Sequence, residues 1–63
     1  MEEYYFYSGI VYLDGNKIQK FVHGIATAEH MCANTVFDEI IKQLKFDYNI
    51  DESKIQLKQF NKV

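Results

Sequence analysis

Residues 4–25, YYFYSGIVYLDGNKIQKFVHGI, decide the fold because they read as two strands joined by a tight turn. The first part, residues 4–13, is mostly aromatic or β-branched, which is the composition of a strand. Asp14 and Gly15 follow, and this pair supplies the two positive-φ residues that a type I′ turn needs. Residues 17–25 then alternate imperfectly, with Phe21 among the apolar positions. The segment therefore predicts a β-hairpin.

A helix is expected over residues 28–45, directly after the hairpin. Thr27 is placed to cap its N-terminus, and Glu29 lies in the first turn, where the helix dipole favours an acid. Lys42 and Lys45 lie near the other end, where the dipole favours a base. A single apolar stripe at helical spacing is formed by Ala33, Val36, Phe37, Ile40, Ile41 and Leu44. The helix should therefore bury one face and leave the other in water.

A third strand is expected over residues 54–61, where an extended apolar pattern resumes. Asn49, in the connection before it, suits a left-handed conformation at the helix end. The order is β-β-α-β, and the helical crossover lets the third strand lie beside the first. The sequence thus predicts a single α+β domain over residues 1–63. It is a three-stranded antiparallel sheet of order 2-1-3 with one helix on one face.

The composition narrows the classes of function. The chain has 63 residues, seven Lys, no Arg and nine Asp plus Glu, so its net charge of -2 gives no electrostatic drive toward nucleic acid. Cys32 is the only cysteine, and we expect it to be a small buried hydrophobe in a reducing compartment. The start of the chain, residues 1–3, is acidic, and no apolar run is long enough to span a bilayer. These features predict a cytoplasmic protein without a membrane partner.

One apolar face of the predicted sheet has no cover. Alternation sends Tyr5, Tyr7 and Val11 to one face of the first strand. The opposite face receives Tyr4, Phe6, Ile10 and Tyr12. The turn alone does not fix which face the helix covers. We take Tyr5, Tyr7, Val11 and Val22 as the candidate partner-binding residues, used for a homodimer or another protein, because Tyr is enriched at interfaces. The alternative is a solvated face with its hydroxyls in water.

Nucleic-acid binding is the second hypothesis. Alternation places Lys54, Lys58 and Phe60 on one side of the third strand, with Ile55 and Leu57 on the other. Lysines interleaved with an aromatic ring suit a single-stranded nucleic acid, whose bases stack while lysines contact phosphates. Lysine on an edge strand also prevents edge-to-edge aggregation, which is the structural interpretation of the same pattern.

Catalytic, metal and cofactor sites are not expected. Cys32 and His30 are two apart on the predicted helix and point to different sides, and no further Cys or His pair completes a metal site. Ser8 and His23 can lie on paired strands, but they lack a third orienting group. A chain of this size has little room for a substrate pocket. The sequence therefore predicts a binding protein that is not an enzyme, without a small-molecule substrate.

The chain resembles small, uncharacterised β-β-α-β proteins encoded by bacteriophages and prophages. The resemblance lies in the aromatic opening strand over residues 4–7, the DGN turn at 14–16, the single amphipathic helix and the closing segment over residues 55–61. It covers nearly the whole chain, and it carries no catalytic residue. It implies an accessory protein of a mobile element that acts by binding a host protein.

Overall fold

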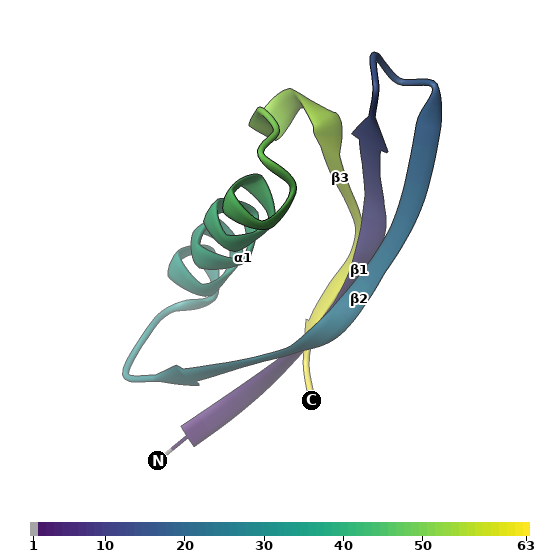
Figure 1. Ribbon diagram of the computed structural model, residues 1–63. Coiled ribbons are helices and arrows are strands. Elements are labelled where there is room, and N and C mark those ends of the chain that lie inside the picture. Colours follow the sequence, from purple (N-terminus) through teal and green to yellow (C-terminus); the bar gives the residue numbers. More distant parts are fainter. Residues whose placement is uncertain (1) are drawn as a thin grey trace.

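The structure, a computed structural model, describes residues 2–63, so Met1 of the acidic start lies outside the described residues. The elements are β1 (Glu2–Leu13), β2 (Ile18–Glu29), α1 (Ala33–Tyr48), the 3₁₀ turn η1 (Glu52–Lys54) and β3 (Ile55–Lys62) (Figure 1). The strands form one sheet in the order β2-β1-β3, and β1 runs antiparallel to both neighbours. The predicted α+β class, sheet order and single helix are confirmed.

The hairpin turn is left-handed over three consecutive residues. Asp14, Gly15 and Asn16 have φ angles of 50°, 63° and 71°, and the Lys17 N–H donates to the Asp14 carbonyl over 3.2 Å. Asn and Asp tolerate this region better than other side chains, and Gly enters it without steric cost. Leu13 then pairs with Ile18, which sets the register of the whole hairpin.

The helix begins later than the sequence predicted. Residues 26–29 extend β2, so residues 28 and 29, the predicted first residues of the helix, lie in a strand. They pair with the first residues of β1, where Glu3 lies opposite Ala28. His30 turns the chain at a φ of 60°, and Cys32 is the N-cap of α1. Thr27 is therefore a strand residue and not the cap. Cys32 is exposed, so the prediction of a buried thiol was wrong.

The helix ends at Tyr48, three residues after the predicted end at Lys45, and the left-handed residue anticipated at Asn49 closes it. Asn49 is left-handed at the C-cap, with φ 52° and ψ 53°, and its N–H donates to the Lys45 carbonyl. The residues that α1 buries are Val36, Ile40 and Leu44. Of the predicted stripe, Ala33 is exposed and Phe37 lies at its margin, 37% exposed. The helix therefore packs on the sheet through one narrow apolar stripe.

β3 carries a bulge that changes which of its side chains face the helix. Ser8 lies opposite Gln59, whereas Gly9 lies opposite Leu57, so Lys58 has no partner in β1. An unpaired extra residue breaks strict alternation. Leu57 and Phe60 consequently both face α1, and the predicted separation of Phe60 from Leu57 was wrong.

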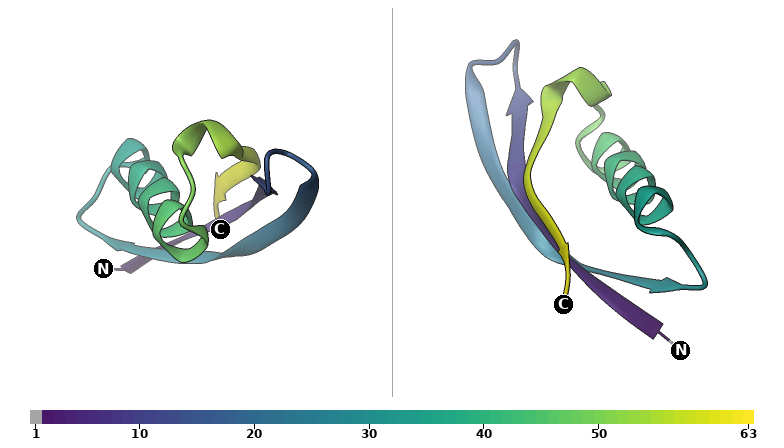
Figure 2. Two further views of the ribbon diagram at one scale, coloured as in Figure 1. Left: turned by 45° about the horizontal axis from the view of Figure 1, so that its top comes forward. Right: turned by 180° about the vertical axis from the view of Figure 1, so that it is seen from behind.

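The sheet bends around the helix, so its covered face is concave and its open face is convex (Figures 1 and 2). Beneath the helix, Tyr5 stacks on Phe60 with centroids 5.2 Å apart, and Phe37 meets Phe60 edge-on at 5.4 Å. The buried apolar residues of this core are Tyr5, Val11, Val22, Ala28, Val36, Ile40 and Leu44. Within residues 2–63, no helix combines the length and hydropathy needed to cross a bilayer.

Candidate functional site

The candidate site is the convex sheet face, on which cross-strand pairs bring apolar side chains together. Phe6 lies opposite Ile25, and Ile10 lies opposite Phe21. Phe21 is 77% exposed and Ile25 is 56% exposed, although both lie in the middle of a strand. Tyr4, at 45% exposure, extends the same face toward the N-terminal end of β1. We call this set of five residues the convex apolar face.

The predicted partner-binding residues lie on the other face of the sheet. Val11 is fully buried, Tyr5 is 7% exposed and Val22 is 8% exposed, all beneath α1. Tyr7 is half-buried and packs against the same core. The assignment of these four residues to the uncovered face is therefore corrected. They hold the helix on the sheet. The side chains at the alternate positions of β1 and β2 point to the other face, toward solvent.

Small residues in the second half of β2 are the signal that identifies the covered face. Gly24, Ala26 and Ala28 share the helix side of the strand with Val22. A Cβ on Gly24 would lie 2.8 Å from the Tyr7 hydroxyl oxygen, so the Tyr7 side chain lies across this glycine. Large side chains occupy the alternate positions. A prediction that ends the second strand at Ile25 misses this alternation of small and large residues.

A shallow hollow of about 290 Å³ lies on the convex side, beside the bulge. Its lining includes Ser8, Ile10, Phe21, His23 and Lys58, so an apolar floor has a hydroxyl, an imidazole and an ammonium group at its margin. Such a mixture suits an apolar partner side chain flanked by a hydrogen-bond acceptor or a carboxylate.

The candidate nucleic-acid residues are not brought together. Lys54 lies in η1 and donates to Asn16 Oδ1 over 2.9 Å. Lys58 borders the convex hollow, whereas Phe60 is stacked on Tyr5 under the helix. A ring packed into the core offers no face on which a base can stack. The structure therefore gives these three residues no common surface.

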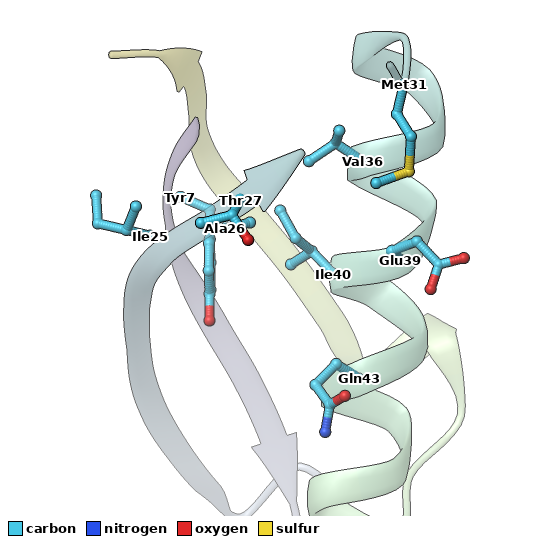
Figure 3. A pocket seen from close by; sticks show the side chains of 9 residues that line it. All are labelled: Tyr7, Ile25, Ala26, Thr27, Met31, Val36, Glu39, Ile40 and Gln43. Atoms are coloured by element: carbon cyan, nitrogen blue, oxygen red, sulfur yellow. The ribbon is translucent and has the colours of Figure 1, made fainter. Parts of the chain in front are cut away.

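A second hollow, of about 240 Å³, lies between β2 and α1 (Figure 3). Val36 and Ile40 point into it from the helix, while Ile25 points away from the helix on the far side of the strand. The full lining is Tyr7, Ile25, Ala26, Thr27, Met31, Val36, Glu39, Ile40 and Gln43. Three of these, residues 25–27, are consecutive in β2. Because their side chains alternate in direction, the hollow must reach the strand's free edge.

Three groups of polar side chains have shifted pKa values. In one of them the Ser53 hydroxyl donates to Asp51 Oδ2 over 3.0 Å and lowers the pKa of Asp51. Lys62 Nζ lies 2.9 Å from Glu3 Oε1, and this hydrogen bond lowers the pKa of Glu3 and raises the pKa of Lys62. At the start of α1, the Thr35 hydroxyl lies 3.2 Å from Cys32 Sγ and lowers the pKa of that thiol. Within residues 2–63, no three His, Cys, Asp or Glu side chains cluster as metal ligands.

Comparisons of this chain with protein-family models, with curated proteins and with solved structures found no match.

Proposed function

We propose that this chain is a non-enzymatic interaction module whose convex apolar face binds another protein. The observation that carries the proposal is Phe21, an aromatic side chain 77% exposed in mid-strand, next to exposed Ile25. Contiguous exposed apolar side chains on a small chain usually mark a contact surface. Aromatic residues also supply much of the binding energy at interfaces.

The curvature of the sheet favours a partner that is not a second copy of the same face. Two convex faces would touch over a small central area, whereas a concave surface can cover the whole convex sheet. Lys58 at the margin of the convex hollow favours a carboxylate on that partner. From the resemblance to phage and prophage proteins, we propose that the partner is a host protein.

The test uses the purified chain to capture a partner and then measures the binary affinity. Phe21→Ser and Ile10→Ser alter the convex apolar face, and Phe46→Ser is the matched control because Phe46 is 83% exposed on the helix. Each face variant should weaken binding by about 30-fold or more if its side chain is a hot spot, and the control should bind like wild type. Equal affinities for all three variants would overturn the proposal.

A further inference from the structure

The two outer edges of the sheet, on β2 and β3, differ in how well they are protected against pairing with a further strand. β3 carries the bulge at Lys58, and Lys62 follows near its end, both of which hinder pairing with a further strand. β2 is 12 residues long, and its segment 21–28 contains no acidic residue, lysine or proline. An unprotected edge of this kind is a template for another strand.

The hollow between β2 and α1 gives that edge room for a further strand. It opens at residues 25–27, where no strand among residues 2–63 pairs with the outer edge of β2. Side chains of an added strand would alternate between the convex side and this hollow. Glu39 and Gln43 border the hollow on the helix side. The added strand should therefore bring a small or basic residue to this side.

We propose that the added strand is β2 of a second copy, paired antiparallel about a two-fold axis at His23. In this register, Phe21 of each copy lies directly opposite Ile25 of the other. Within each copy Phe21 already lies beside Ile10, and Ile25 beside Phe6. Two continuous apolar rows, Ile10–Phe21–Ile25–Phe6, would then cross the dimer, one on each side of the axis. The most exposed side chains of β2 cover one another.

Charge complementarity selects the same register. Lys17, the turn residue directly before β2, would lie at the end of the pairing beside Glu29, the last residue of β2 in the other copy, and opposite charges at this distance attract. On the concave side, Lys20 would lie opposite Ala26, beside the hollow that Glu39 borders. Within its own copy the Lys20 Nζ lies 5.2 Å from the Tyr48 ring centroid, so this lysine would have to leave that ring to reach Glu39. An axis at Gly24 would instead set Phe21 against Thr27, and an axis at Ile25 would set it against Glu29. Only the register centred on His23 brings Phe21 against Ile25 and also brings Lys17 close to Glu29.

The dimer does not depend on the proposed function, because it uses the β2 edge. It would join two convex faces into one six-stranded sheet. Phe21 and Ile25 would touch across the seam, while their outward surfaces still meet solvent on the same side. Self-association is measured on the pure chain. Partner binding is judged on Ile10→Ser, because Ile10 lies on β1, whereas Phe21 would also contact the second copy.

The first measurement is the solution mass of the wild-type chain by light scattering over a range of concentrations. The second is a cysteine trap in a Cys32→Ser background. Directly opposed residues have Cα atoms about 4.5–5.5 Å apart, which is within disulfide range. Under mild oxidation His23→Cys should therefore give at least about tenfold more covalent dimer than Gln19→Cys. An equal mixture of Gln19→Cys and Thr27→Cys should also cross-link, since these residues face each other across the axis.

The solution mass and the cysteine cross-links together test the proposed dimer and its register. A concentration-dependent dimer that is trapped at His23, but not at Gln19 alone, supports the proposal. A monomer at every concentration overturns it. A dimer trapped at Gly24→Cys or Ile25→Cys but not at His23→Cys overturns the register. His23 is exposed, so the variant should fold, and circular dichroism verifies this before oxidation.

Discussion

At the start of α1, the pKa of the Cys32 thiol is lowered by the neighbouring Thr35 hydroxyl. Cys32 is the N-cap but makes no side-chain cap hydrogen bond, and its Sγ lies 3.2 Å from Thr35 Oγ1. A hydroxyl that donates to the thiolate stabilises the charged form, and this lowers the pKa of Cys32. The thiol is also exposed, so its titration can be followed by alkylation.

Replacing Thr35 with Val should raise the pKa of Cys32, because the largest contribution that lowers it is the Thr35 hydroxyl. The thiolate is the reactive form, so alkylation by iodoacetamide should slow at neutral pH and its pH profile should move upward. Mass spectrometry at timed intervals measures the rate. Thr27→Val is the matched control and should leave the profile in place. An unchanged profile in Thr35→Val would mean that the backbone N–H groups alone tune the thiol.

At the scale of elements, the β-bulge depends on a close approach of two backbones. A Cβ on Gly9 would lie 2.3 Å from the Gln56 carbonyl oxygen and 2.9 Å from Leu57 Cα. Real Cβ atoms do not approach backbone so closely, so β3 would have to move away from β1. The absence of a side chain at Gly9 is what lets the bulge form beside Lys58.

Gly9→Ala should therefore cost about 2–3 kcal/mol of unfolding free energy, the upper range for a side chain forced into packed structure. Gly24→Ala is the matched glycine substitution and should cost less. The nearest atoms there belong to the outer end of the Tyr7 side chain, which can move. Urea unfolding of the three proteins compares these costs. If both variants lose the same stability, the backbone contact at the bulge is not the limiting feature.

The elements that the sequence predicted well are those set by local residue pattern. The aromatic strand, the left-handed turn residues and the C-cap at Asn49 depend on neighbours within a few positions. The predicted start of α1 was wrong because residues 26–29 pair with the start of β1, which is distant in the sequence. The sheet face predicted for Phe60 was wrong because Lys58, which is unpaired in the bulge, shifts the residues after it to the opposite face. Contacts between segments far apart in the chain decided both points.

On the scale of the whole molecule, the same limit applies to the candidate site. The sequence indicated two apolar sheet faces and one helix, and that is what the structure contains. The closing pair of the hairpin, Leu13 with Ile18, sets only which residues of β1 and β2 share a face. The face that α1 covers carries the small residues Gly24, Ala26 and Ala28, and most of these lie beyond the predicted end of the second strand. Phe21 and Ile25 consequently lie on the uncovered face, whereas Tyr5 and Val11, which were predicted there, lie beneath α1.

Stability at this scale rests on very few side chains. A chain of this size is expected to have about 3–9 kcal/mol of unfolding free energy. Ile40 is 5% exposed and lies in the middle of the stripe that α1 buries. Ile40→Ala should cost about 2–4 kcal/mol, which is a large part of the total. Phe46→Ala, which removes an 83% exposed ring, should change stability little.

Thermal and urea unfolding of both variants check this expectation. Because the proposed dimer would make stability depend on concentration, all chains are compared at one concentration. A small loss in Ile40→Ala would mean that the helix contributes little to the fold and that the strand pairs hold the molecule together.

The central position of β1 has a consequence for the order in which the molecule is assembled. Its pairing with β2 is local and can form within microseconds of the turn closing. Its pairing with β3 joins residues as distant as Tyr5 and Lys62, so the loop that must close includes nearly the whole chain. During synthesis on a ribosome, the hairpin emerges first and waits with its covered face exposed. Until β3 supplies Phe60, the ring of Tyr5 lacks its stacking partner, and exposed apolar surface of this kind is what chaperones bind on incomplete chains.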